Sequence, residues 1–164
     1  MSTYTRDRVT RKLAVVLAGL STPSSTRLLA DRLADATTAR LAAEGIDTER
    51  ALIELREHAI AVTSNLVNGF ASPELEAAIE SLTGADGTIF STPIFTTSYS
   101  GLFKSFIDVL EPGSLADLPV IIAATGGTER HSLALDYAIR PLFTYHHAIV
   151  TPTGVYAATG DWGS

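Results

Sequence analysis

Two patterns of apolar residues alternate along this chain. One is a short continuous apolar run, and the other is a segment in which apolar residues recur every three or four positions. Short continuous apolar runs of strand length are typical of strands buried on both faces of a parallel sheet. They predict strands at residues 13–18, 50–55, 87–91, 119–124 and 148–151. Between them, apolar residues spaced three and four apart predict amphipathic helices with one stripe facing the core. These helices are expected at residues 26–44, 73–83, 102–110 and 132–146.

Capping and helix-breaking residues support these boundaries. The segment 72–74, Ser-Pro-Glu, combines an N-cap serine, a proline at the first helical position and an acid in the first turn. Gly84 ends that helix, and Pro141 predicts a kink or a break inside the last one. Residues 57–72 are ambiguous and indicate a loop with a short helix, whereas residues 1–10 indicate a loose N-terminal tail.

Strands that alternate with helices predict an α/β fold in which helices cover both faces of a parallel sheet. We expect a single domain over residues 1–164, a flavodoxin-like three-layer αβα sandwich with a five-stranded sheet of order 2-1-3-4-5. Such a domain has a final helix after strand 5, and the sequence from Gly154 to Ser164 has no helical pattern. We therefore expect that helix to be missing from the sequence, and a partner subunit or a longer native chain to cover the apolar sheet face.

Three unusual loops follow the first, third and fourth predicted strands, at the edge where sheets of this order bind ligands. Residues 19–27 are rich in serine and threonine and open a helix, whose unpaired N–H groups and dipole suit a phosphate. The plainer interpretation is that these hydroxyl residues only cap the helix. Residues 92–101 place apolar side chains where a flat ring can lie, and two glycines in residues 125–131 permit close backbone approach.

Composition and charge narrow the classes of function. The net charge of -6 and the pI of about 5.1 leave no basic face for general nucleic-acid binding. The chain has no cysteine, which excludes disulfides, cysteine-based zinc sites and a cysteine nucleophile. The adjacent residues His146 and His147 lack the spacing of metal ligands, so we expect no metal site.

Missing motifs narrow the classes further. The first loop has neither the Walker pattern nor GxGxxG, which disfavours nucleoside-triphosphate and Rossmann dinucleotide sites. The start of the chain does not fit a signal peptide, and no apolar stretch approaches the ~18 residues of a membrane helix. We therefore expect a soluble cytoplasmic protein with no membrane contact.

Three motifs carry a resemblance to a known family, together with the hydroxyl-rich loop at residues 21–27. They are TPIFTTSYSGLFKSFID at residues 92–108, ATGGTERHSLALDYAIRPLF at residues 124–143 and the closing PTGVYA at residues 152–157. On these motifs the chain resembles the NAD(P)H-dependent FMN reductases of the flavodoxin-like flavoprotein superfamily. The resemblance spans nearly the whole chain from Leu13.

The resemblance implies which residues hold FMN. The first loop is implied to contact the phosphate, the segment after the third strand to contact the isoalloxazine ring, and the Thr-Gly-Gly loop to border the ring from its other side. In that order the residues are Ser21, Ser24, Ser25 and Thr26, then Pro93, Ile94 and Phe95, then Thr125, Gly126 and Gly127. Related enzymes often carry Tyr-Asn where this chain has Phe95-Thr96, which removes a hydroxyl and an amide beside the ring.

The resemblance also implies the activity, in which a nicotinamide of NADH or NADPH stacks on the flavin and delivers hydride to its N5 atom. Reduced FMN then passes electrons to an acceptor or serves a monooxygenase. The flavin carries this chemistry, so no catalytic side chain is assigned. Arg27 is a candidate contact to the phosphate and His131 to the nicotinamide, against the plainer interpretation that both are ordinary polar residues.

Family members form homodimers or homotetramers in which a neighbouring subunit walls the flavin pocket, so we expect a homo-oligomer. Two other functions fit the same fold. One is a quinone or azo-dye reductase with tightly held FMN. The other is a non-enzymatic protein, either an electron carrier like flavodoxin or a flavin-binding regulatory module.

Overall fold

A sheet of seven strands forms the centre of the computed structural model, which describes residues 8–163. The strands are β1 (Val9–Leu17), β2 (Ile46–Glu54), β3 (Gly87–Phe95), β4 (Ser98–Tyr99), β5 (Pro119–Gly126), β6 (Ile149–Val150) and β7 (Val155–Ala158). The main path of the sheet runs β2-β1-β3-β5-β6, and its neighbours are parallel. Off this path, β4 pairs antiparallel with β3, and β7 pairs parallel with β5.

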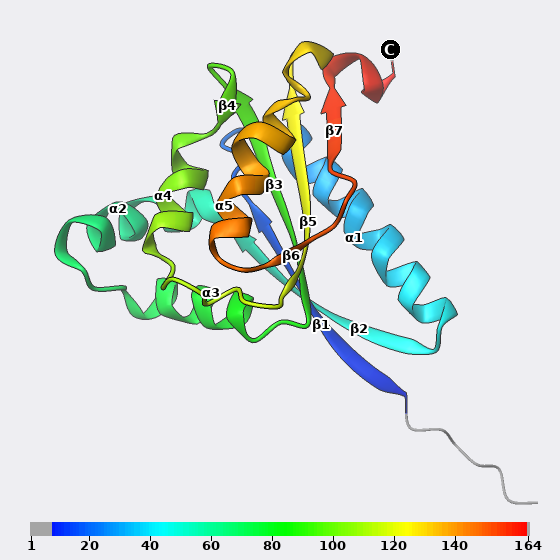
Figure 1. Ribbon diagram of the computed structural model, residues 1–164, viewed down its shortest axis with the longest axis horizontal. Coiled ribbons are helices and arrows are strands. Elements are labelled where there is room, and N and C mark those ends of the chain that lie inside the picture. The colour runs from blue at the N-terminus through cyan, green and yellow to red at the C-terminus, as the bar shows by residue number, and fades with distance from the viewer. Residues whose placement is uncertain (1–7, 164) are drawn as a thin grey trace, which may run out of the picture.

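Helices cover the sheet on both faces, which gives three layers (Figure 1). The α-helices are α1 (Ser25–Ala43), α2 (Ala59–Asn68), α3 (Pro73–Thr83), α4 (Gly101–Val109) and α5 (Arg140–Tyr145). Short 3-10 turns stand at η1 (Leu55–His58), η2 (Glu129–His131) and η4 (Thr159–Trp162), and η3 (Leu135–Ile139) is a π-helix. The helix α1 packs on one face, and the side chains of α2, α3, α4 and α5 meet in one core on the other.

The alternation of side chains along β1 explains why both faces are covered. Val15 and Leu17 pack with Ala30 of α1, whereas Ala14 and Val16 face the opposite helical layer. None of these five side chains is more than 3% exposed. Because successive side chains of a strand point to opposite faces, an uninterrupted apolar run needs a helix on each side.

Three phenylalanines fill the larger core below the carboxyl ends of the strands. Phe90 of β3 lies 4.6 Å from Phe143 of α5 and 6.0 Å from Phe103 of α4, measured between ring centroids. Phe103 and Phe143 are 6.2 Å apart. Tilted and edge-on contacts of this kind add to the free energy gained by burial. They fix α4 and α5 against the strand whose end carries residues 92–95.

The prediction of five strands is wrong, because the sheet has two further short strands, β4 and β7. The expected strand at residues 148–151 is only the two-residue β6, and β7 pairs farther along the same edge of β5. Pro152, which lacks an N–H group, lies in the interruption between them. The expected loop at residues 92–101 is in fact the end of β3, a tight turn and β4.

The last expected helix and the N-terminal tail also differ from the prediction. Residues 132–146 hold the π-helix η3 followed without a gap by α5, and Pro141, where the sequence predicts a kink or a break, stands next to the change from π-helix to α-helix. Residues 57–72 hold the second half of η1 and all of α2. Of the predicted tail, residues 1–7 lie outside the described residues, and Val9 already belongs to β1.

The edge of the sheet beyond β5 is only partly covered on the α1 side. Among the described residues, β7 is followed by the turn η4 and not by an α-helix. Ile149 of β6 is 56% exposed there. Within residues 8–163, no helix combines the length and the hydropathy that a membrane span requires.

His146, at the end of α5, makes the stability of the fold depend on pH. The residue is 3% exposed, and its Nδ1 atom has no hydrogen-bond partner among the described residues. Burial lowers the pKa of His146 below its ordinary value. The unfolded chain, with a histidine pKa of about 6.5, therefore takes up a proton first as the pH falls. The free energy of unfolding is highest above that pH and decreases below it.

We expect the His146→Gln variant to show a shallower fall in the free energy of unfolding between about pH 8 and pH 5 than the parent protein. Chemical denaturation at several pH values measures this slope. The matched control is His58→Gln, which removes a histidine that lies outside the phenylalanine core. Equal slopes in the parent and in His146→Gln would contradict the assignment.

Candidate functional site

A pocket of about 440 Å³ opens at the carboxyl edge of the sheet, a size within the range of small-molecule sites. The loop after β1, the ends of β3 and β5, and the turn η4 form its walls. All ten residues that the resemblance implies for FMN line this one pocket: Ser21, Ser24, Ser25, Thr26, Pro93, Ile94, Phe95, Thr125, Gly126 and Gly127. The structure thus brings together three loops that are far apart in the sequence.

The loop after β1 delivers the chain to the start of α1. Ser24 is the N-cap, and its side-chain oxygen accepts a hydrogen bond from the backbone N–H of Arg27 at 3.2 Å. Gly19 makes room for that cap, since a Cβ at this position would lie 2.4 Å from Ser24 Oγ. The helix begins at Ser25, so the N–H groups of Ser25 and Thr26 have no acceptor inside it. They add to the positive end of the helix dipole.

The hydroxyls in and around this loop fall into two groups. Some are hydrogen-bonded within the protein, and others are accessible to a ligand. Thr26 Oγ1 and Thr125 Oγ1 lie 2.8 Å apart in a hydrogen bond, with their residues 2% and 3% exposed. Ser91 Oγ also donates to the backbone oxygen of Thr26, at 3.3 Å. These contacts join α1 to β3 and β5. In contrast, Ser21 and Ser25 are exposed at the pocket, where a ligand can reach their hydroxyls.

The end of β3 provides an apolar wall that a tight hairpin holds in place. Ile94 pairs with Tyr99 across the turn, and Phe95, 46% exposed, stands at the tip. The turn residues Thr96 and Thr97 have φ angles of 48° and 71°, in the left-handed region that residues with a Cβ rarely adopt. Two-residue hairpins require this backbone shape, and here threonines adopt it.

The end of β5 forms the facing wall, with its backbone close to the side chain of Tyr156. The hydroxyl of Tyr156 donates a hydrogen bond to the backbone oxygen of Thr128 at 2.7 Å. A Cβ at Gly126 would lie 2.1 Å from that hydroxyl, so a glycine is needed here. Gly127 has open space around it, and the backbone at this wall is accessible to a ligand.

Four further residues line the pocket that the sequence analysis did not identify: Gly19, Leu20, Thr159 and Trp162. Trp162 belongs to η4 and packs with Leu29 of α1, while the guanidinium of Arg32 lies 5.1 Å from its ring centroid. Asp161 fixes this turn by accepting a hydrogen bond from the backbone N–H of Ala158 at 2.7 Å. The only sequence signal was that Trp162 is the single tryptophan of the chain.

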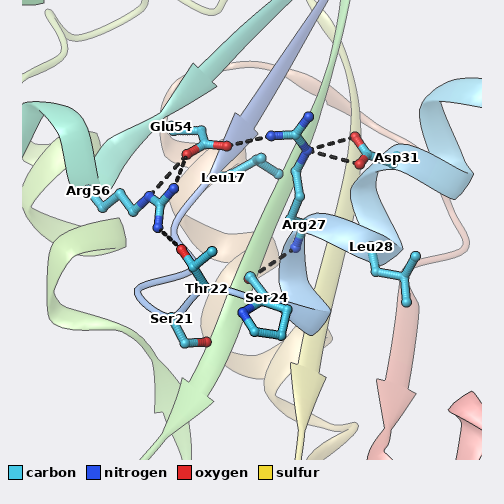
Figure 2. A pocket seen from close by; sticks show the side chains of 11 residues that line it. Leu17, Ser21, Thr22, Ser24, Arg27, Leu28, Asp31, Glu54 and Arg56 are labelled. Atoms are coloured by element: carbon cyan, nitrogen blue, oxygen red, sulfur yellow. Dashed lines mark hydrogen bonds and ion pairs between the residues drawn. The ribbon is translucent and has the colours of Figure 1, made fainter.

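Neither of the two additional candidates lines this pocket. The guanidinium of Arg27 turns to the other side of the loop, where it pairs with Asp31 and Glu54 (Figure 2). His131 lies in η2, outside the lining. In the part of the chain that the structure describes, no group of three or more metal-ligating side chains is assembled.

Comparisons with known proteins agree with this geometry. The sequence pattern of the NADPH-dependent FMN reductases matches residues 11–163. An FMN reductase (NADPH) from Pseudomonas aeruginosa is 37% identical over 151 residues, which cover 92% of this chain and 78% of that protein. The NADH-dependent FMN reductase SfnF from Pseudomonas fluorescens is 36% identical over 151 residues, with the same 92% and 78% coverage.

Solved structures give the same result. An oxidoreductase from Corynebacterium diphtheriae superposes with a TM-score of 0.92 at 47% identity, and the match covers 94% of this chain and 85% of that one. An NADH:FMN oxidoreductase in its apo form superposes with a TM-score of 0.79 at 27% identity, covering 92% and 76%. Because the sequence pattern of the NADPH-dependent FMN reductases matches residues 11–163, nearly the whole chain, the chain belongs to this family.

Proposed function

We propose that the protein is an NAD(P)H-dependent FMN reductase, an oxidoreductase that binds FMN in the pocket at the carboxyl edge of the sheet. One observation carries the placement of FMN. The pocket has a hydroxyl-rich helix start at one end and an apolar wall with accessible backbone at the other. These two ends match the two ends of FMN, a phosphate and a flat ring with a polar edge.

The phosphate end is built from neutral donors. Ser21 and Ser25 offer hydroxyls, and Ser24 orients the loop by capping α1. The first N–H groups of a helix that is 19 residues long add a fixed dipole. Thr26 positions the loop, because its hydroxyl is hydrogen-bonded to that of Thr125 and holds the loop against β5. Such an arrangement binds a phosphate without a lysine or an arginine.

The ring end is built from backbone and apolar side chains. Pro93, Ile94 and Phe95 lie on one side, and Thr125, Gly126 and Gly127 on the other. When bound, the flavin supplies the hydride acceptor at its N5 atom. The chain's own contribution is to hold the ring in a fixed orientation and to leave one face open to the nicotinamide. We assign no acid or base, since hydride transfer to the ring requires none from the side chains.

We propose further that reduced FMN leaves the protein to serve a flavin-dependent monooxygenase, and that the protein acts in the cytoplasm as a homodimer or a homotetramer. The partly covered sheet edge at β6 supports a subunit contact. Retention of FMN through desalting would instead favour a reductase with a tightly held flavin, such as a quinone or azo-dye reductase. The matched relatives include both NADPH- and NADH-dependent enzymes, so both coenzymes belong in the test.

We expect purified protein to oxidise NADH, NADPH or both only when FMN is added, with a rate that saturates as the FMN concentration rises. The absorbance of the reduced nicotinamide measures this. A heat-denatured sample controls for direct reaction between the coenzyme and free FMN. No oxidation with either coenzyme, together with measurable FMN binding, would overturn the reductase and leave an electron carrier or a regulatory module.

We expect FMN to quench the fluorescence of Trp162 in a saturable way, because this residue lines the pocket and is the single tryptophan of the chain. A titration of the protein with FMN, followed at the tryptophan emission, measures it. In the Trp162→Phe variant the emission disappears, and binding is followed by the flavin fluorescence. If the emission of Trp162 stays constant while the flavin fluorescence reports binding, FMN occupies a different place.

We expect Ser25→Ala to raise the Kd for FMN about tenfold, the effect of losing one hydrogen bond to a charged group. Riboflavin lacks the phosphate, so its affinity should change by less than about twofold. The matched control is Ser64→Ala on α2, which removes a serine hydroxyl far from the pocket lining. An equal loss of affinity for FMN and riboflavin in Ser25→Ala would contradict the assignment of Ser25 to the phosphate.

A further inference from the structure

The loop after β1 has a pocket on each side. Behind it lies a second pocket of about 310 Å³ (Figure 2). Gly19, Ser21 and Ser24 line both this second pocket and the proposed FMN pocket. The loop therefore separates the two pockets, and little protein packs against the side of it that faces the second pocket. Whatever fixes its position also fixes the hydroxyls that face the FMN pocket.

A row of polar contacts crosses the second pocket and reaches the loop. Arg56 of η1 donates from Nη1 to the hydroxyl of Thr22 and from Nε to Glu54 Oε2 at 3.0 Å. Glu54, at the end of β2, accepts from Arg27 Nη1 through Oε1 at 2.5 Å. Arg27 also donates from Nε to both oxygens of Asp31, at 2.9 Å each. Figure 2 shows this row of side chains from Thr22 to Asp31.

The charges in the row balance, with two guanidinium groups and two carboxylates. Glu54 is the central group, and its side chain is 16% exposed, less than that of either arginine. The pKa of Arg27 is raised, chiefly by its hydrogen bond to Asp31. Both arginines are held in ion pairs. This explains why Arg27 does not turn toward the FMN pocket.

We propose that Arg56 is a positioning residue for FMN binding. It acts through the series Thr22, Arg56, Glu54 and Arg27, which we call the loop bracket. Thr22 lies between Ser21 and Ser24 in the chain, so the contact that holds Thr22 also places both serines. At its other end the bracket is attached to the first turn of α1 through Arg27. The inference rests on the proposed FMN site.

The bracket requires the forked head group of arginine. A guanidinium donates in two directions at once, here to a hydroxyl and to a carboxylate. A lysine at the same position has a single nitrogen on a flexible stem, and it cannot hold both partners in a fixed geometry. The positioning role of residue 56 therefore requires an arginine, and a positive charge alone is not sufficient.

The test compares the Kd for FMN in the parent protein with that in Arg56→Ala, Thr22→Val, the double variant and Arg56→Lys. Thr22→Val removes the hydroxyl that Arg56 contacts and leaves every ion pair of the bracket in place, so it tests the contact even if Arg56→Ala folds poorly. The matched control is Arg50→Ala. Arg50 of β2 also pairs with a carboxylate, Asp35, and with a threonine hydroxyl, Thr38, but lines neither pocket.

We expect Arg56→Ala and Thr22→Val each to raise the Kd for FMN about tenfold, and the double variant to be no weaker than Arg56→Ala alone. Arg56→Lys should recover only part of the affinity. The loss should appear in the KM for FMN, while kcat at saturating FMN is recovered. Arg50→Ala should bind as the parent does. A Kd within about twofold of the parent in Thr22→Val and Arg56→Ala, or additive effects in the double variant, would overturn the bracket.

These outcomes are distinct from failure of the proposed function. If the parent protein binds FMN and reduces it but the variants match it, the bracket alone is wrong. If the parent protein does not bind FMN, the proposed function is wrong, and the role of Arg56 is wrong with it.

Discussion

A buried hydrogen bond between the side chains of Thr26 and Thr125 holds the candidate site together. It joins the first turn of α1 to the end of β5, two elements separated by 99 positions in the sequence. Because Ser91 of β3 bonds to the backbone of Thr26 as well, the first turn of α1 and the two neighbouring strands β3 and β5 share one anchor. A hydrogen bond without access to water is stronger than an exposed one and is costly to break, so it fixes the distance between the loop after β1 and the pocket wall at the end of β5.

Around this anchor, a closely packed core supports the strands, and the residues that line the pocket stand at the edge of that core. The strand ends rest on the core of Phe90, Phe103 and Phe143, which cannot shift without loss of close packing. The residues that line the pocket stand on the loop after β1, at the last residues of β3 and β5 and on the turn η4. Protein sites often place adaptable loops on a fixed scaffold in this way.

The sequence predicts the layers of this fold well because its strands are buried on both faces, and such strands give continuous apolar runs. The same reasoning fails where pairing depends on a turn. The strand β4 has two residues, and the backbone shape of Thr96 that creates it is one that threonine rarely adopts. The break between β6 and β7 depends likewise on a local interruption that periodicity does not report.

The pocket was predictable for a different reason. Parallel sheets bring the ends of their strands to one edge, so loops with unusual composition after successive strands gather there. Trp162 escaped prediction because its position depends on packing against α1 and Arg32, which no local pattern encodes. The ion pairs that turn Arg27 away from the pocket depend on Glu54 of a neighbouring strand, another contact that only the folded chain creates.

The neutral lining of the proposed phosphate end has a consequence for the rate at which FMN arrives. In the described part of the chain, the residues that line the pocket include no lysine or arginine, and the whole chain carries a net charge of -6. A doubly charged phosphate therefore meets no cationic side chain in the lining and is repelled by the net charge of the chain, so we expect association at an ordinary diffusional rate that salt barely changes or even increases. Hydrogen bonds and apolar contacts that act only at short range do the selection, so discrimination between flavins resides in how slowly each one leaves.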